Sequence, residues 1–373
     1  MPETPPTSIL SYDDTDEYRP EPVPPPTLPP WQDGSIRIGI HTSIAGDIVS
    51  ALEIAHRLGA NTLQIFSTSP RMWPRVGGAR IPSADAARFK ARRSELRLGP
   101  LVVHANYLIN LASPERVLRV RSIQAFRDEM VRCLDLGADY LVVHPGAARD
   151  GDRQRGIRDV AESLRQAIRG LKLSSLRILL ENTAGQGASL GWRMEELAAL
   201  LDACPEAPLG ACIDTAHLLA AGYEIRTADG LERTLQLLDR TVGLSRVHVV
   251  HVNDSKAPFG SRVDRHQHIG KGHIGLEAFA RILNHAVLAA TRPTEDGRGM
   301  VRRALILETP IDRPGDDLRN VRALWSLVGG MPAKKLAGRP ASVAAAARTR
   351  VKRKPKGKRK KRATDKKKRK QRK

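Results

Sequence analysis

The sequence predicts a (β/α)₈ barrel, an α/β fold, with a disordered arm at each end. The first observation is that, from about Ile36 to Val328, eight short β-branched runs alternate with amphipathic stretches. A segment of about 290 residues suits such a barrel, which typically has about 250. The second observation is that six consecutive runs end in or next to His, Glu or Asp. Barrel strands converge on one mouth at their C-terminal ends, so this pattern predicts a shared site. A doubly wound open sheet is the structural alternative.

The strand candidates share short length and β-branched or apolar composition. They are Ile36–Thr42, Thr62–Ser67, Leu101–Ala105, Tyr140–His144, Arg177–Glu181, Gly210–Asp214, Val247–Val252 and Ala304–Glu308. The helix candidates between them have apolar residues spaced by three and four, such as Val117, Val120 and Ile123. These candidates are Ile48–Leu58, Glu115–Leu136, Arg158–Leu171, Met194–Leu201, Leu231–Thr241 and Leu276–Leu288.

Charge divides the chain into three predicted parts: an arm over 1–33, a barrel over 34–332 and a tail over 333–373. The arm is rich in Pro and acids and carries a net charge of −6, whereas the tail carries +20 of the total +22. Neither arm has enough apolar surface to offset its chain entropy, so both are expected to be disordered. A Lys/Arg tail neutralises phosphates and releases counterions, which predicts non-specific DNA binding. A solubility tail is the plainer alternative.

Composition also limits the cellular setting. A hydrophobic share of 41% allows a sizeable core, but no apolar run approaches the roughly 20 residues of a membrane span. The N-terminus has no signal-peptide pattern. Cys133, Cys204 and Cys212 are an odd number without paired spacing, which indicates free thiols in a reducing cytoplasm. We therefore expect a cytoplasmic, nucleoid-associated monomer that does not bind membranes.

Metal-type side chains gather at the predicted mouth. They are His104, His144, Glu181, Asp214, His217, His251, Asp264, His266 and Glu308. Crowded carboxylates repel one another and are costly to desolvate, so bound cations are the natural compensation. Five imidazoles and four carboxylates without a cysteine favour zinc, with manganese as the alternative. Nine ligands are too many for one ion, which indicates two or three.

Two of these ligands come from the loop Ser261–Gly270, which follows the seventh strand candidate. Asp264 and His266 are two residues apart, so an extended backbone turns both side chains the same way. Arg262 and Arg265 flank them and would steer an anion towards the site. Two other histidines are predicted not to bind metal. His41 is expected to support a ligand, and His248, out of phase with His251, is expected to face the helix layer.

Motifs in a fixed order carry a resemblance to a known family. They are HANYLINL at 104–111, HPG at 144–146, ENTAGQG at 181–187, ACIDTAHLLAAGY at 211–223, HVNDSK at 251–256, FGSRVDRH at 259–266 and LET at 307–309. The chain from about Ile36 to Val328 resembles endonuclease IV, the zinc-dependent apurinic/apyrimidinic endonuclease family on a xylose-isomerase-like barrel. This chain departs from the family pattern at Ala216, where cysteine is common in the family, and at Lys271, where an acidic residue is common.

The resemblance implies a three-zinc phosphodiesterase (deoxyribonuclease IV) that acts on duplex DNA with abasic sites. It assigns His104, His144 and Glu181 to one ion; Glu181, Asp214, His251 and Glu308 to a second; and His217, Asp264 and His266 to a third. Glu181 would be the catalytic residue that bridges two ions and positions the attacking hydroxide. The implied products are a 3′-hydroxyl and a 5′-deoxyribose phosphate, and blocked 3′ ends would also be trimmed.

Lesion recognition is implied for three further residues. Arg71, Tyr107 and Leu108 match family positions that enter the minor groove, and a wedge costs least where a base is already missing. Arg262 and Arg265 would contact phosphates. Two alternatives belong to other functional classes. One is a metal-dependent sugar isomerase or epimerase on the same barrel, and the other is a DNA-compacting protein that acts through its basic tail.

Overall fold

The computed structural model describes residues 36–73, 80–149, 151–285, 288, 292–293, 300–301 and 303–329. The predicted arms, 1–33 and 333–373, lie outside these residues, so their disorder and the domain boundaries stay predictions. All eight predicted strands fall inside the described ranges.

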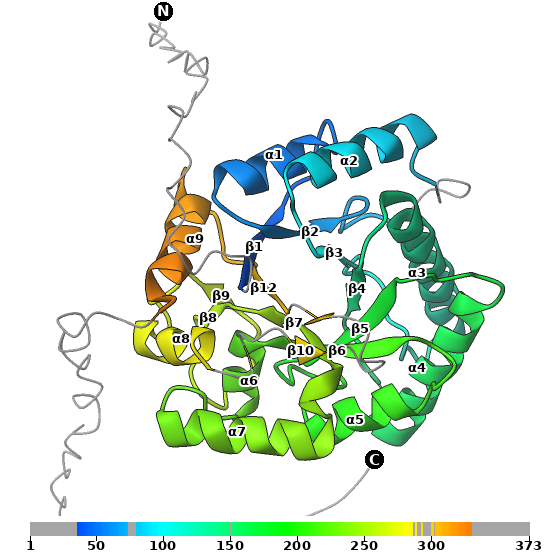
Figure 1. Cartoon of the computed structure of the whole chain (residues 1–373). Coiled ribbons are helices and arrows are strands. Elements are labelled where there is room, and N and C mark those ends of the chain that lie inside the picture. Colours follow the sequence, from blue (N-terminus) through cyan, green and yellow to red (C-terminus); the bar gives the residue numbers. More distant parts are fainter. Residues whose placement is uncertain are drawn as a thin grey trace, which may run out of the picture. The chain divides into compact units, whose positions relative to one another are not determined.

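Eight parallel strands form a closed barrel, which confirms the predicted fold (Figure 1). They are β1 (Arg37–Thr42), β2 (Thr62–Phe66), β3 (Leu101–His104), β4 (Tyr140–Val143), β5 (Arg177–Glu181), β6 (Leu209–Asp214), β7 (Val247–His251) and β12 (Ala304–Leu307). The order around the barrel is β1-β12-β7-β6-β5-β4-β3-β2. Every predicted strand is confirmed with each end within one residue of its observed end. The open-sheet alternative is excluded because β1 pairs with both β2 and β12.

Helices surround the barrel. They are α1 (Ser50–Arg57), α2 (Ser83–Glu95), α3 (Arg116–Leu136), α4 (Arg153–Ile168), α5 (Met194–Asp202), α6 (Thr215–Ala221), α7 (Ala228–Thr241), α8 (Leu276–Leu283) and α9 (Asp316–Leu327), with a 3₁₀ turn, η1 (Leu244–Arg246). All six helix candidates correspond to observed helices, although α4 begins five residues before the predicted Arg158 and α8 ends at Leu283, five residues before the predicted Leu288. The sequence prediction missed α2, α6 and α9. In α2 only Ala86 and Phe89 are buried, too few to give a helical apolar pattern.

Side chains at alternate positions along the barrel strands belong to two separate hydrophobic cores. Interior side chains fill the barrel below the mouth: Val102, Val142, Leu179, Cys212, Val249, Ala304 and Ile306. The intervening strand residues pack against the helices in a second, larger core. Because side chains alternate with a period of two, the residue two positions beyond an interior side chain also faces inward, but at the mouth. Val102 therefore directs His104 into the mouth, and Val249 does the same for His251.

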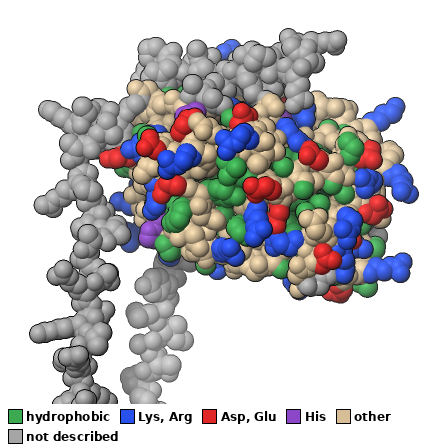
Figure 2. Space-filling view, turned by 90° about the horizontal axis from the view of Figure 1, so that it is seen from below, with side chains coloured by type: hydrophobic (Ala, Val, Ile, Leu, Met, Phe, Trp, Pro, Cys, Tyr) green, Lys and Arg blue, Asp and Glu red, His purple; other side chains and the backbone are tan. Residues whose placement is uncertain are grey.

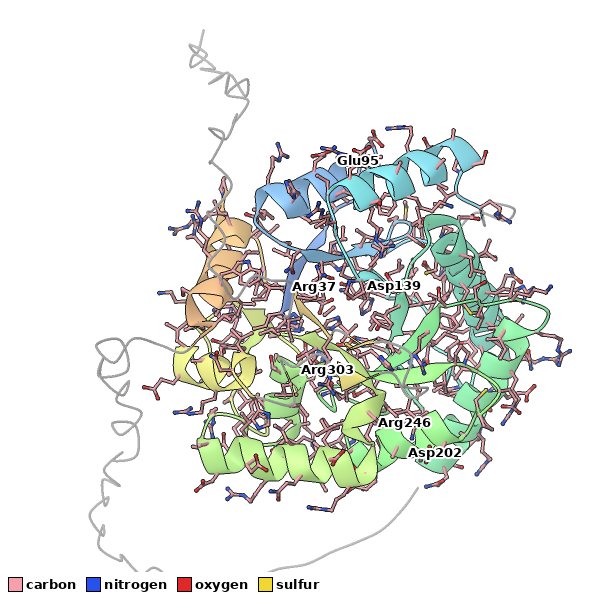
Figure 3. The ribbon with its side chains drawn as sticks, viewed as in Figure 1. Arg37, Glu95, Asp139, Asp202, Arg246 and Arg303 are labelled. Carbon is pink, nitrogen blue, oxygen red and sulfur yellow. The ribbon has the colours of Figure 1, made fainter. Side chains whose placement is uncertain are left out.

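Arg303, labelled in Figure 3, immediately precedes β12 and so lies at the end of the barrel opposite the mouth. Arg303 is buried and donates to the carbonyl oxygens of Val247 at 2.9 Å and Leu244 at 2.7 Å. Beside it, the β6–β7 register shifts between Ala211 and Cys212. The neighbouring His248 ring lies 5.4 Å from that of Tyr140, an interior residue. The prediction that His248 faces the helix layer is therefore wrong, because the strand irregularity changes the alternation.

Two short antiparallel strand pairs are separate from the barrel sheet: β8 (Asp254–Ser255) with β9 (His266–Gln267), and β10 (Arg292–Pro293) with β11 (Met300–Val301). The first pair carries His266 back to the mouth. Among the described residues, no helix is long and apolar enough to cross a membrane. Figure 2 shows one face of the molecule, where Lys/Arg and Asp/Glu side chains are interspersed rather than gathered by sign. The three cysteines are free and buried, as predicted.

Candidate metal centre

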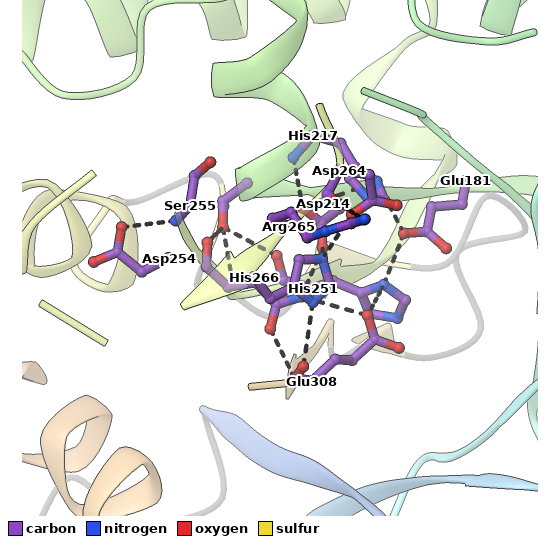
Figure 4. Close-up of polar contacts among 12 residues, drawn as sticks. Glu181, Asp214, His217, His251, Asp254, Ser255, Asp264, Arg265, His266 and Glu308 are labelled. Atoms are coloured by element: carbon purple, nitrogen blue, oxygen red, sulfur yellow. Dashed lines mark hydrogen bonds and ion pairs between the residues drawn. The ribbon is translucent and has the colours of Figure 1, made fainter. Parts of the chain in front are cut away.

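The barrel brings the predicted ligands together at the mouth. Strand ends supply His104, Glu181, Asp214 and His251, and the residues just after β4 and β12 supply His144 and Glu308. The first turn of α6 adds His217, whose backbone N–H donates to Asp214 Oδ1 at 2.7 Å. The loop after β8 adds Asp264, and β9 adds His266 (Figure 4). Whether these side chains bind metal stays a prediction, but their convergence is a property of the fold.

Glu181 lies at the centre of the cluster and is fully buried. Its Oε2 is 3.3 Å from His104 Nε2 and 3.1 Å from His144 Nε2. Its Oε1 is 3.0 Å from His251 Nδ1. The two carboxylate oxygens therefore face two different groups of side chains. One group is His104, His144 and Glu181, and the other is Glu181, Asp214, His251 and Glu308, each with ligand atoms within 4.8 Å of one another.

A third group lies around Asp214, His217 and His266, with ligand atoms within the same 4.8 Å spacing. Asp264 adjoins it, because its Oδ1 is 3.2 Å from His217 Nε2 and 3.6 Å from His266 Nε2. The resemblance placed Asp214 only with the second ion. In the structure, Asp214 Oδ2 also lies 3.6 Å from His266 Nε2, so this carboxylate faces two groups as Glu181 does.

The orientation of four imidazoles fits a metal centre. One ring nitrogen of each is within hydrogen-bond distance of an oxygen that can only accept. These pairs are His104 Nδ1 with Ala105 O at 2.8 Å, His217 Nδ1 with Asn182 O at 2.8 Å, His266 Nδ1 with Glu308 O at 3.2 Å and His251 Nε2 with Gln64 Oε1 at 2.8 Å. In the neutral ring that nitrogen is the donor, so the other presents its lone pair.

Those lone pairs face carboxylates, an arrangement that either a proton on the ring or a metal ion between the two groups would satisfy. The buried Nε2 atoms of His217 and His266 have no hydrogen-bond partner among the described residues. His104, His217 and His251 are themselves buried, so water cannot easily substitute. Nitrogen and oxygen donors predominate in these groups, which suits zinc or manganese. Cys212 also lies close to Glu181 and His251, but burial raises the pKa of its thiol to about 12, which disfavours a thiolate ligand. The residues present therefore fit the expected ions.

Electrostatics in the cluster follow from burial and opposed charges. Burial disfavours the ionised Glu181, yet the His251 and His144 charges outweigh it and hold the pKa of Glu181 well below its usual range. Burial also disfavours protonated His217, but Asp214 and Asp264 raise its pKa well above its usual value. The cluster therefore holds ionised carboxylates that draw positive charge onto the imidazoles. A metal ion supplies the same charge without a proton.

Several side chains that support the candidate ligands were not predicted from the sequence. Gln64, fully buried on β2, donates to Glu308 Oε1 at 2.5 Å and lies 2.9 Å from His41 Nδ1. Asn253 donates to Asp214 Oδ2 at 2.6 Å and accepts from the Glu308 backbone N–H at 2.7 Å. His41 thus contacts a residue that supports the ligands, in agreement with its predicted role. A buried amide at an inward strand position is the sequence signal that points to Gln64.

Two of the predicted DNA-contacting residues, Tyr107 and Arg265, line the cavity over the same cluster. Arg71 and Tyr107 are exposed and Leu108 is half-buried. Arg262 stacks over the Trp192 ring at 4.2 Å, and Arg265 lines a cavity of about 340 Å³ over the metal-type cluster. Figure 4 shows Arg265 among the ligands rather than pointing away from them. The structure therefore places Arg265 at the cavity, and the DNA contacts of these residues stay a prediction.

Comparisons with known proteins agree with this geometry. Residues 52–289 match the family model described as a xylose isomerase-like TIM barrel. The probable endonuclease 4 of Solibacter usitatus is 49% identical over 300 residues, covering 79% of this chain and 97% of that protein. The chain belongs to the endonuclease IV family. The probable endonuclease 4 of Chloroflexus aurantiacus is 40% identical over 296 residues, covering 79% of this chain and 99% of that protein.

Solved structures extend the comparison for this endonuclease IV family member. Endonuclease IV from Thermus thermophilus matches with a TM-score of 0.66 and 39% identity, covering 78% of this chain and 98% of that one. A D-tagatose 3-epimerase-like protein matches with a TM-score of 0.56 but only 18% identity, covering 81% of this chain and 100% of that one. The second match shows a shared fold alone.

Asp254 also supports the site, because it holds the loop that follows β9. Its carboxylate is fully buried and accepts backbone N–H groups from Gly270 at 2.9 Å, Gly272 at 3.0 Å and Ile274 at 2.9 Å. An additional N–H comes from Ser255 at 2.8 Å. A Cβ at Gly272 would lie 2.4 Å from Asp254 Oδ1, so only glycine allows this close approach.

We predict that Asp254→Asn lowers the free energy of unfolding, because its amide would point hydrogens at backbone donors. Each buried donor left unpaired costs about 1–3 kcal/mol. The displaced loop directly follows β9, which carries His266 and pairs with the strand that contains Asp254, so bound metal should also fall. Thermal unfolding and metal analysis of the purified variant measure both effects. Asp316→Asn is the matched control, since Asp316 is buried and accepts backbone N–H groups outside the metal-type cluster. Equal metal content in both variants would contradict the prediction.

Proposed function

We propose that this chain repairs DNA by hydrolysing the phosphodiester 5′ to apurinic or apyrimidinic sites. The products are a 3′-hydroxyl and a 5′-deoxyribose phosphate, and blocked 3′ ends are trimmed by the same centre. The observation that carries the proposal is the buried Glu181 carboxylate, whose two oxygens face separate groups of metal-type side chains. Such a carboxylate suits phosphodiester hydrolysis by close-set ions.

The proposed cofactor is three Zn²⁺ ions, with Mn²⁺ as a substitute. The first is held by His104, His144 and Glu181; the second by Glu181, Asp214, His251 and Glu308; and the third by His217, Asp264 and His266. Bound ions lower the pKa of a water molecule and neutralise charge on the phosphate oxygens. Glu181 is the proposed catalytic residue, because it is shared between two groups and would orient the nucleophile between them.

The chain's other residues select and hold the substrate. Arg265 reaches the cavity above the ligands, where a scissile phosphate would lie. Arg262, two residues before Asp264 in the same loop, is held over the Trp192 ring. Arg71, Tyr107 and Leu108 are proposed to enter the duplex where a base is missing, since unstacking costs least there. Partial burial, followed by the Glu308 and Glu181 charges, raises the pKa of Tyr107 to about 12, so its phenol stays neutral.

The alternatives fit less well. A sugar isomerase or epimerase of this fold uses one or two ions held mainly by carboxylates, whereas this cluster has five imidazoles. The epimerase-like structures share 18% and 16% identity with the chain, against 39% for an endonuclease IV structure. A DNA-compacting protein would need only the tail, so nothing would keep nine metal-type side chains converged at the mouth.

The proposed setting is a monomer acting on chromosomal DNA in the cytoplasm. All of the candidate ligands come from one chain, so the site does not need a second copy. The tail at 333–373 lies outside the described residues and is proposed to hold DNA without sequence preference, on the strength of its charge.

We expect the zinc-replete protein to nick a duplex at a tetrahydrofuran abasic analogue, and not the same duplex with an intact base. A polymerase should extend the product, which reports the 3′-hydroxyl. Activity should survive brief EDTA and be lost after prolonged chelation, because ions held in buried groups dissociate slowly. Turnover of a ketose or aldose without any nicking would overturn the proposal.

The third ion can be tested by counting metal. The double variant Asp264→Asn/His266→Ala should lower bound zinc from about three ions per chain to about two. About four ligands hold each ion, so the loss of two should release the third ion. Mass spectrometry of the desalted protein gives the ratio. His268→Ala with Asp312→Asn is the matched control, because those side chains are 3.2 Å apart outside the metal groups. An unchanged count in the first variant would exclude these ligands.

The tail is tested by deletion of residues 333–373. Affinity for undamaged DNA should fall and its dependence on salt should flatten, because up to 21 Lys and Arg side chains no longer release counterions. Fluorescence anisotropy at several salt concentrations measures both. Nicking at low salt should persist. Deletion of residues 1–33, which carry net negative charge, is the control, and equal binding by both deletions would show that the tail has another purpose.

A further inference from the structure

Two segments at the mouth carry exposed side chains and are joined by one buried amide. The segments, called here the mouth segments, are 67–73, which follows β2, and 105–111, which follows β3. Asn106 is 3% exposed. Its Nδ2 donates to Ser69 O and to Met72 O, both at 2.8 Å. Its Oδ1 accepts from the Leu108 backbone N–H at 2.8 Å.

These bonds involve the backbone on both sides of the exposed residues. The carbonyls that Asn106 binds lie two residues before and one residue after Arg71. The Tyr107 N–H donates to Pro70 O at 3.2 Å, which adds a direct bond between the mouth segments. Further along the first segment, the Arg121 guanidinium lies 4.4 Å from the centre of the Trp73 ring. The backbone of both segments is therefore held on both sides of the side chains they present.

The amide rests on a buried polar network from α3. Glu129 accepts a hydrogen bond from the Asn106 backbone N–H and another from the Ser67 hydroxyl. Arg132 donates to Ser67 Oγ at 2.7 Å and forms a 3.2 Å ion pair with Glu129. All four side chains are almost fully buried. Buried charges are costly unless they are paired and hydrogen-bonded. Here the Glu129–Arg132 pair meets both conditions, and it holds the backbone of Asn106 in place.

The mouth segments present a compact group of exposed side chains. Met72 is 65% exposed and Tyr107 is 59% exposed, unusual values for large apolar or aromatic residues. The Tyr107 ring lies 5.2 Å from that of Phe66 and 5.8 Å from that of His104. Arg71 is also exposed. The aromatic Tyr107 thus stands beside the metal-type cluster, and the basic and aliphatic side chains are on the segment whose backbone is bonded to it.

We propose that Asn106 is a positioning residue for lesion recognition. Its amide holds the mouth segments in one arrangement, so that Arg71, Met72 and Tyr107 meet the DNA as a preassembled wedge. This inference rests on the proposed function, because it assigns the wedge to abasic DNA. Preassembly removes the cost of ordering two loops when the duplex binds. Met72 is the apolar member of the wedge and fills part of the space left by the missing base.

The test compares Asn106→Ala with a matched neighbour, Asn110→Ala. Asn110 also makes three side-chain bonds to backbone, but these join its loop to Ala147 and Ala112 rather than to the first mouth segment. Asn106→Asp is the second variant. It keeps the acceptor for Leu108 but turns an oxygen towards two carbonyls, so it should separate the segments without creating a cavity.

Four quantities are measured on each folded variant: metal content, hydrogen exchange of amides in the mouth segments, steady-state nicking of the abasic-analogue duplex, and hydrolysis of bis(p-nitrophenyl) phosphate. For both Asn106 variants, exchange should accelerate in the mouth segments and KM for the duplex should rise about tenfold, equivalent to about 1.4 kcal/mol. We expect kcat, the rate on the small diester and the metal content to stay near their wild-type values. Asn110→Ala should keep the wild-type KM.

The outcomes separate this inference from the proposed function. Failure of the wild-type protein to nick the duplex overturns both. Wild-type nicking with an unchanged KM in the Asn106 variants overturns only the positioning role. An equal rise in KM for Asn106→Ala and Asn110→Ala also overturns it, because general loosening of the mouth would then explain the effect. A loss of metal in the Asn106 variants would assign Asn106 to the metal centre instead.

Discussion

The mouth of this barrel is organised around one interaction, the contact of the buried Glu181 carboxylate with imidazoles on both sides. A fully buried carboxylate is unfavourable unless positive charge surrounds it. Its neighbours His104, His144 and His251 come from three different strands, so they meet Glu181 only when the barrel closes. The site therefore forms only when the barrel closes, since parallel strands bring their last residues to a common point.

The ligand-bearing strands also orient one another. The carbonyl that fixes the His217 ring belongs to Asn182, the residue after Glu181, and the carbonyl that fixes His266 belongs to Glu308. Each ring is thus aligned by the backbone of another candidate ligand or its neighbour. Partners of this kind determine which ring nitrogen is free and how the ring points. Displacement of one strand end would misalign ligands assigned to a different ion, which couples the three groups mechanically.

Sequence patterns predicted the strands and the converging ligands because both depend on local periodicity. An inward residue two positions beyond Val249 must face the mouth, and His251 does. Periodicity failed for His248, where a register shift beside β6 alters the alternation. It also could not reveal the hydrogen-bond partners of Gln64, Asn253 and Asp254, because those partners lie at other places in the chain. Such support depends on tertiary contacts, which residue spacing along one strand does not encode.

The mouth therefore combines two kinds of order with different physical origins. The metal-type cluster is held by strand geometry, which is rigid because the barrel interior beneath it is close-packed. The mouth segments have no strand of their own, and they rely on Asn106 and on the buried pair of Glu129 with Arg132. An apolar core at that place would gain stability but would leave loop carbonyls without partners. Buried polar groups instead specify one loop arrangement, and that arrangement sets which side chains stand at the edge of the proposed metal centre.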